Sequence, residues 1–495
     1  MGRKVLRRMA TGIDGLDNIL CGGLAADRMY LVEGSPGVGK TTLAMQFLME
    51  GARRGERCLY VTLSETRDEL DAVADSHGWD LGGIDVVELS QVEDVLTARS
   101  QNTLFQPAEV ELTGLSKLLA SEFDRVNPQR MVLDSLSEMR LMAQSTLRYR
   151  RQILAFKHHF ATGNCTVLLL DDRSGTALDA HVQSIVHGMI TLETVPLKFG
   201  INRRYLSIAK MRGSAFREGN HDYVIKAGGI TVFPRLVASD HAVQPRSAMF
   251  KSGNAHLDDL VGGGLDAGTG TLFMGPAGSG KSTIASMFAG QAAAAGNRVL
   301  YFAFDETTSI LTHRARELGL GFDESIAAGS LNIRQVDPAE IAPGELANEI
   351  IEAVNRGGVR MVVLDSLNGY VNAMPQEEYL HLHLHELLSY LNQRGVCSIM
   401  ILAQHGLVGS MGAPVDVSYL ADTVLLTRFF EARGALKKAV SVIKKRSGAH
   451  EDTIRELSMS HGGIHVGDAL TRFEGVMTGV PRFLGGTMPG SGDRP

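Results

Sequence analysis

Short apolar runs alternate with amphipathic stretches along the first half of the chain. Four runs are rich in aliphatic residues: MYLVEG (29–34), CLYVTL (58–63), RMVLDSL (130–136) and TVLLLDD (166–172). Between the first two, TTLAMQFLMEGARRG (41–55) has helical periodicity. Strands without polar alternation are typical of parallel sheets buried on both faces. The pattern predicts an α/β fold, with a mostly parallel sheet covered by helices on both faces.

The same pattern recurs in the second half. GSPGVGKTT (34–42) corresponds to GPAGSGKST (275–283) at an offset of 241 residues (281 − 40). The pentapeptide VLDSL occurs at 132–136 and again at 363–367, at an offset of 231 (365 − 134). Repetition on this scale indicates a duplicated domain.

The duplication sets the expected domain boundaries. We predict a first domain at 1–240 and a second at 241–482, with the junction inside 232–253, a polar segment that contains two prolines. The Gly- and Pro-containing end, 483–495, is predicted to be a disordered tail.

Each repeat carries G-x-x-x-x-G-K-[ST] between a predicted strand and a predicted helix. In this phosphate loop (P-loop), backbone N–H groups surround the phosphates, the lysine reaches the β- and γ-phosphates, and the final hydroxyl ligates Mg²⁺. The chain is therefore expected to bind ATP and Mg²⁺ twice. The predicted nucleotide-binding residues are Gly34, Ser35, Gly37, Val38, Gly39, Lys40, Thr41 and Thr42, and then Gly275, Gly278, Ser279, Gly280, Lys281, Ser282 and Thr283.

Acidic residues follow two strands of each repeat. Asp134 and Asp365, in VLDSL, are expected to bind Mg²⁺ together with the hydroxyls of Thr41 and Ser282. Serine follows each aspartate, so the carboxylate that activates the attacking water must lie elsewhere. Glu65 and Glu306, after the second strand, are the candidates. Solvated loop acids are the alternative interpretation.

This arrangement resembles the RecA-like branch of P-loop ATPases, and two such units in tandem resemble the KaiC family. The segments SETRDELDAVADSHGWDL (64–81), KMRGS (210–214), ADTVLL (421–426) and FEGVMTGVPR (473–482) extend the resemblance over nearly the whole chain. It implies two tandem RecA-like P-loop NTPase domains and a homohexameric ring with nucleotides between subunits. It also implies ATP hydrolysis and a serine/threonine autokinase activity.

The resemblance implies that a neighbouring subunit contributes a Lys and an Arg to each nucleotide. Lys210, Arg212 and Ser214 match the family's K-x-R-G-[ST] segment in the first repeat. In the second repeat the text is KKRSG, which retains Lys444 and Arg446. An arginine supplied in trans stabilises charge on the γ-phosphoryl group. Without the family, such a segment is a solvated basic hairpin.

Two departures from the family concern the chemistry. The family's adjacent pair of glutamates is Ser64–Glu65 in the first repeat and Asp305–Glu306 in the second. Hydrolysis at the first site is therefore expected to be slow or carried by Glu65. Asp305 is the expected base for taking a proton from a hydroxyl, and it is also a predicted metal ligand. The family's adjacent Ser-Thr acceptors are Ser418 and Tyr419 here, so Ser418 is the phosphoacceptor candidate, and a purely structural serine is the alternative.

Composition limits the other possibilities. The chain has 495 residues, a formal net charge of −6 and four scattered cysteines, which predict neither a zinc site nor a disulfide framework. No window approaches eighteen consecutive apolar residues, so we expect a cytoplasmic protein without a membrane segment. The acidic balance argues against nucleic acid as a partner. The basic segment 140–159 is interpreted as one helix with a solvated cationic face.

Two further functions stay open at this stage. A nucleotide-dependent assembly scaffold would bind ATP without kinase activity, and a RecA- or helicase-like DNA-dependent ATPase would share the fold. The expected partners are other copies of the chain and, by resemblance, a KaiB-like or sensor-kinase protein. The pathway that such a protein would serve, circadian or another form of signalling, does not follow from the residues.

Overall fold

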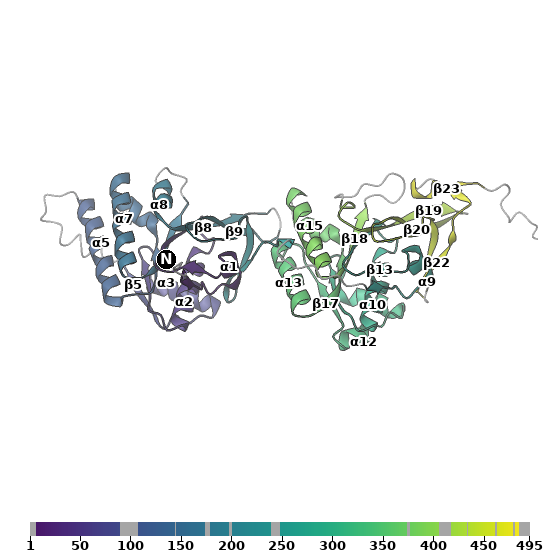
Figure 1. Ribbon diagram of the computed structural model, residues 1–495, viewed down its shortest axis with the longest axis horizontal. Helices are drawn as coiled ribbons and strands as arrows, with labels where there is room; N and C mark the ends of the chain where they lie inside the picture. Colours follow the sequence, from purple (N-terminus) through teal and green to yellow (C-terminus); the bar gives the residue numbers. More distant parts are fainter. Residues whose placement is uncertain are drawn as a thin grey trace, which may run out of the picture. The chain divides into compact units, whose positions relative to one another are not determined.

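A computed structural model describes residues 6–89, 107–143, 145–173, 179–197, 200–238, 248–373, 377–404, 417–432, 434–460, 463–478 and 481–484. The chain divides into two compact units, Met1–Arg235 and Leu236–Pro495 (Figure 1). The division lies inside the predicted junction. Each unit has its own sheet and its own cores.

The first unit is built on a nine-stranded sheet in the order β11-β10-β9-β8-β3-β7-β6-β4-β5. Strands β8, β3, β7, β6, β4 and β5 run parallel, and β9, β10 and β11 extend the sheet antiparallel. The predicted parallel core is confirmed. The strands are β1 (Arg8–Met9), β2 (Leu24–Ala25), β3 (Met29–Gly34), β4 (Cys58–Thr62), β5 (Ile84–Glu88), β6 (Arg130–Asp134), β7 (Thr166–Asp172), β8 (Gly188–Val195), β9 (Arg203–Met211), β10 (His221–Lys226) and β11 (Gly229–Phe233).

Helices cover both faces of this sheet because the parallel strands are apolar on both sides. In β3, Tyr30 and Val32 join the core under α1, α2 and α3, whereas Met29 and Leu31 join the core under α5, α6, α7 and α8. The helices are α1 (Asp14–Ile19), α2 (Lys40–Arg53), α3 (Arg67–His77), α5 (Pro107–Val126), α6 (Leu136–Met142), α7 (Thr146–Thr162) and α8 (Asp179–Ile185).

The second unit repeats this topology strand for strand, in the order β16-β15-β17-β18-β14-β19-β20-β21-β22. Helices α13 and α15 cover one face of the sheet, and α10 and α12 cover the other (Figure 1). The strands are β12 (Met249–Phe250), β13 (Leu265–Asp266), β14 (Gly270–Pro276), β15 (Arg298–Ala303), β16 (Leu331–Gln335), β17 (Val359–Asp365), β18 (Cys397–Gln404), β19 (Thr423–Ala432), β20 (Ala435–Lys445), β21 (Arg455–Ser460), β22 (Gly463–Ala469), β23 (Phe473–Glu474) and β24 (Arg482–Phe483). The helices are α9 (Ala255–Leu260), α10 (Lys281–Ala294), α11 (Thr308–Glu317), α12 (Phe322–Ala327), α13 (Pro343–Asn355), α14 (Leu367–Ala373) and α15 (Glu377–Gln393).

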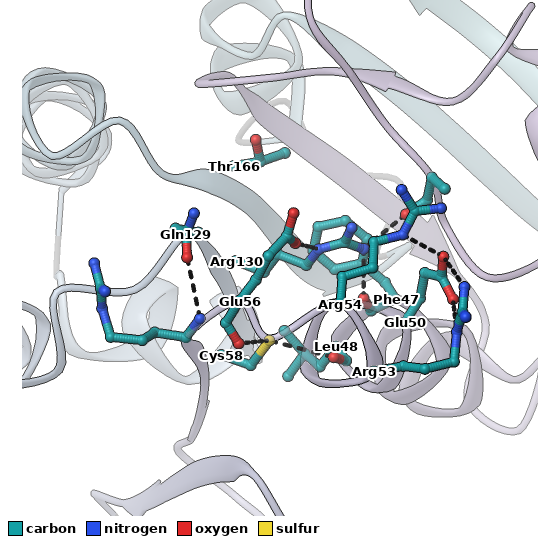
Figure 2. A network of polar contacts seen from close by, with 12 residues as sticks. Phe47, Leu48, Glu50, Arg53, Arg54, Glu56, Cys58, Gln129, Arg130 and Thr166 are labelled. Carbon is teal, nitrogen blue, oxygen red and sulfur yellow. Dashed lines mark hydrogen bonds and ion pairs between the residues drawn. The ribbon is translucent and has the colours of Figure 1, made fainter.

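A buried arginine distinguishes the first unit from the second. Arg130, at the start of β6, is 0% exposed, and its guanidinium donates to the carbonyls of Ala10 and Phe47 at 2.7 Å and to Glu56 (Figure 2). It also lies 4.7 Å from the centroid of the Phe47 ring. A Cβ on Gly51 would come within 2.5 Å of Arg130 Cδ, so this turn of α2 needs glycine.

Two sequence predictions about elements need correction. The segment 140–159 is not one helix, because α6 ends at Met142 and α7 begins at Thr146, where the Ser145 side chain caps the Arg148 backbone N–H. Phe483 is not part of a disordered tail, since it pairs with Phe473 in a two-stranded sheet and their rings lie 5.4 Å apart. Residues 485–495 lie outside the described part.

Three of the four cysteines lie in the hydrophobic cores of the two units. Cys58, Cys165 and Cys397 are buried, Cys21 is exposed, and all four are free thiols. Burial raises the pKa of Cys58 to about 11. Within the described ranges, no helix is both long and apolar enough to cross a membrane.

Candidate active sites

The two P-loops occupy equivalent places at the carboxyl edge of the two sheets. The first loop connects β3 to α2, and the second connects β14 to α10. The residue before each lysine, Gly39 or Gly280, is left-handed (φ 99° and 104°) and gives its helix no side-chain cap. The first backbone N–H groups of these helices are therefore not taken by a capping side chain and suit an anion. The loops fit the phosphates of ATP.

Not every predicted loop residue presents its side chain to that space. Ser279 is fully buried, and its hydroxyl donates to the Pro276 carbonyl at 2.8 Å and lies 2.7 Å from the Thr427 hydroxyl. Thr42 and Thr283 are also buried. At these three positions we expect the backbone N–H, rather than the hydroxyl, to be the group available to a phosphate.

The loop hydroxyl and the strand aspartate lie within hydrogen-bond distance in both units. Thr41 Oγ1 lies 3.1 Å from Asp134 Oδ2, and Ser282 Oγ lies 3.1 Å from Asp365 Oδ1. Burial raises the pKa of both aspartates, against the hydrogen bonds that each accepts. A hydroxyl beside a buried carboxylate is the oxygen donor set that Mg²⁺ takes in P-loop enzymes. Thr41, Asp134, Ser282 and Asp365 would hold the ion.

Each strand aspartate has a tyrosine partner that no motif in the sequence indicates. The hydroxyl of Tyr60 donates to Asp134 at 2.6 Å, and that of Tyr301 donates to Asp365 at 2.7 Å. Both tyrosines lie in the repeated segments LYVTLSET and LYFAFDET at the common offset, so the repeat alignment contained this signal. The bond fixes the carboxylate. In the first site Tyr60 and Thr41 share Asp134 Oδ2, whereas in the second site Tyr301 takes Asp365 Oδ2 and Ser282 takes Oδ1.

The two loop lysines differ in their counter-ions. Lys40 donates to Asp172 at 2.7 Å and to the Gly34 and Ser35 carbonyls. Lys281 donates to the Pro276 carbonyl at 2.7 Å, and burial lowers its pKa to about 8. Asp172 was not predicted as a site residue, although it ends an apolar strand beside the loop.

The glutamates after the second strand also differ between the repeats. Glu65 Oε2 is buried and has no hydrogen-bond partner among the described residues, and burial raises the Glu65 pKa to about 6. Glu306 is instead held by Arg314. Asp305 accepts a hydrogen bond from the hydroxyl of Ser366, so it lies beside the end of β17, next to Asp365. Ser64 is exposed.

The basic residues expected from a neighbouring subunit lie far from the loops of their own units. Arg212 N–H donates to the His187 carbonyl, and His187 N–H donates to that of Met29, at the start of β3. The loop begins at the other end of this strand, about 17 Å away at ~3.3 Å per residue. Lys210 and Arg212 bind the carbonyls of Gln183 and Ser184 at the end of α8. Ser214 Oγ is buried without a partner among the described residues.

The second unit shows the same separation. Lys444 donates to the Ala421 carbonyl at 2.7 Å, and Arg446 to that of Tyr419 at 3.0 Å. Ser418 lies in the same turn, because its carbonyl accepts from Lys444 at 3.3 Å. This turn precedes β19, at the amino edge of the sheet. Neither the basic pair nor Ser418 can reach the loop of its own unit.

Comparisons with known proteins agree with this architecture. A family model described as "ATPase: KaiC" matches residues 9–237 and 250–471. The chain is 26% identical over 485 residues to "Circadian clock oscillator protein KaiC" of Picosynechococcus sp. (strain ATCC 27264 / PCC 7002 / PR-6), covering 97% of this chain and 93% of that protein. It is 25% identical over 484 residues to the protein of that name from Synechococcus elongatus (strain ATCC 33912 / PCC 7942 / FACHB-805), covering 97% and 92%.

Proposed function

The chain belongs to the KaiC ATPase family, and on this premise we propose that it hydrolyses ATP with Mg²⁺ at both P-loops in a homohexameric ring. The observation that carries the proposal is the repeated constellation of loop lysine, hydroxyl and tyrosine-bound aspartate. Glu65 in the first site, and Asp305 or Glu306 in the second, would accept the proton of the attacking nucleophile.

The positions of the basic residues support the proposal of a ring, because these residues lie away from the P-loop of their own unit. Lys210 and Arg212 lie at the sheet edge opposite the loop, as do Lys444 and Arg446. If the ring places this edge against the next subunit's loop, these cations can stabilise charge on the γ-phosphoryl group. The nucleotide would then hold two subunits together, and hydrolysis would depend on assembly.

Serine phosphorylation is the second part of the proposal. Ser418 shares its turn with the carbonyls that bind Lys444 and Arg446. A neighbour's γ-phosphate that meets these cations would therefore lie close to the Ser418 hydroxyl. Attack by Ser418 Oγ would form the phosphoester bond, break the bond to ADP, and pass the hydroxyl proton to Asp305 of the neighbouring site.

Incubation with Mg²⁺ and γ-labelled ATP tests this step. We expect label on the protein, and we expect its complete loss in Ser418→Ala while phosphate release continues. Tyr419→Phe is the matched control, because it removes only the adjacent hydroxyl, which lies 3.3 Å from His381 Nδ1. Label that persists in Ser418→Ala would place the acceptor elsewhere, and phosphate release without label in the wild type would leave an ATPase alone.

Turnover at the first site should fall as the pH drops through about 6. Burial raises the pKa of Glu65 to about 6, with the charge of Asp134 adding to the effect. Only the deprotonated carboxylate accepts a proton from water, so the base is active above this pH and lost below it. The measurement is kcat/KM in the Glu306→Gln variant from about pH 5 to about pH 8. The Glu65→Gln variant, in which the second site accounts for turnover, is the control for ionisation of the substrate. A first-site profile of kcat/KM that does not fall below about pH 6 would contradict the role of Glu65.

A further inference from the structure

An arginine clamps one of the two glutamates. Arg314, on α11, donates through Nη1 to Glu306 Oε2 at 2.7 Å and through Nη2 to Glu306 Oε1 at 2.6 Å. The two side chains are 30% and 20% exposed, so the pair is partly shielded from water. A bidentate Arg–carboxylate pair is among the stronger and more directional contacts in proteins. It holds both oxygens of Glu306 toward α11.

Among the residues that the structure describes, the first unit shows no such clamp. The position equivalent to Arg314 is Val73, at the common offset of 241 (314 − 73), and both helices begin after a capping threonine, Thr66 or Thr307. Val73 packs against the hydrophobic core of its unit. Glu65 has one oxygen without a hydrogen-bond partner among the described residues. Within the described ranges, Glu306 is thus held by an arginine and the equivalent Glu65 is not.

We propose that Arg314 is a positioning residue that restrains Glu306 and slows ATP hydrolysis at the second site. This inference rests on the proposed ATPase function. In hydrolysis, a water oxygen bonds to the γ-phosphorus, the bond to ADP breaks, and the water proton passes to a carboxylate. Glu306 must break a charge-assisted hydrogen bond before it can turn to that water. The second site therefore keeps its γ-phosphoryl group longer than the first.

The charge of Arg314 has to be separated from its geometry in any test. Asp365 is close enough for its charge to interact with that of Arg314. Removing the side chain therefore changes the field at the metal site as well as releasing Glu306. Arg314→Lys keeps the positive charge and loses the two-pronged contact. Arg314→Val reproduces the residue found in the first unit.

The experiment measures second-site turnover in the full-length chain. Glu65→Gln removes the base of the first site and keeps its loop. In this background we expect Arg314→Val to raise kcat about threefold to tenfold, and Arg314→Lys to raise it less, with KM for ATP nearly unchanged, because general bases contribute 10²–10⁴-fold in all. Adding Glu306→Gln should cancel the gain, because the released carboxylate is its cause. A merely structural role of Arg314 would not depend on Glu306.

The reciprocal change tests the clamp at the first site. In a Glu306→Gln background, Val73→Arg should slow first-site turnover, and Val73→Gln, which adds bulk without charge, should slow it less. Unchanged or lower kcat in Arg314→Val, or a gain that survives Glu306→Gln, would overturn the clamp while wild-type turnover upheld the ATPase. No turnover in the wild type would overturn both.

Discussion

Replacement of Lys281 by alanine should lower the amount of phosphate incorporated into the protein by at least ~100-fold. This is the scale expected when a preorganised charge at the reacting group is lost. Lys281 begins α10, is 6% exposed and lies beside the hydroxyl–aspartate pair of the second site. Burial lowers its pKa to about 8, and the nearby charge of Asp365 opposes that shift. The phosphates of ATP would supply its missing counter-charge. Alanine leaves them without this cation.

The matching change in the first loop should act differently. By analogy with the family, Lys40→Ala should impair ring assembly more than phosphorylation, because the first site would bind the nucleotide that joins subunits. The Lys40→Ala variant also loses the ion pair with Asp172. In the part of the chain that the structure describes, the second unit has no such pair for Lys281, because the residue equivalent to Asp172 is Ala403. Molecular mass by light scattering with ATP and γ-label incorporation report the two properties. Equal effects of both variants on both readouts would contradict a division of labour.

Replacement of Arg130 by alanine should lower the free energy of unfolding of the first unit by about 3–5 kcal/mol, the range for breaking a buried ion pair from one side. The loss would leave Glu56 and two backbone carbonyls without their donor, and a cavity next to Phe47 (Figure 2). Chemical denaturation followed by the single tryptophan, Trp79, which packs against the core of this unit, measures the change.

The second unit supplies the control for this prediction. It has Met361 where the first has Arg130, and Ala292 where the first has Gly51. Gly51→Ala alone should be strongly destabilising, because the new methyl group would meet both Arg130 and Cys58 Sγ. In Arg130→Met it should cost less, since only the contact with Cys58 remains, giving a coupling of about 0.5–3 kcal/mol in a double-mutant cycle. Additive effects of the two changes would show that they are independent.

Sequence patterns anticipated the parallel core and the family because both rest on local signals. The apolar runs around Tyr30 and Leu168 became neighbouring buried strands, and the glycine loops came at the ends of the expected strands. The antiparallel extension from β8 to β11 was not predicted, since its half-exposed strands carry a weaker pattern. The break between α6 and α7 depends on one capping serine, Ser145, inside a helical pattern.

The candidate sites could be predicted only in part from the sequence, for a different reason. Residues inside a motif, such as Lys40 or Asp134, can be identified in the sequence from their spacing. Asp172 and Arg314 cannot, because Asp172 reaches the site through the parallel pairing of β7 with β3, and Arg314 reaches it from the second turn of α11. Their partners are set by tertiary structure. The comparison of equivalent positions, Val73 with Arg314, shows a chemical divergence of the repeats that no motif contains.

The central claim is that both P-loops bind Mg²⁺ and ATP and turn the nucleotide over. The most direct measurement is phosphate release by the purified full-length chain with excess Mg²⁺, beside Lys40→Ala, Lys281→Ala and the double variant, with bound nucleotide counted in the same samples. The account predicts Mg²⁺-dependent release that each single variant reduces and the double variant abolishes. Nucleotide bound at both loops without release, or release unchanged in the double variant, would contradict it.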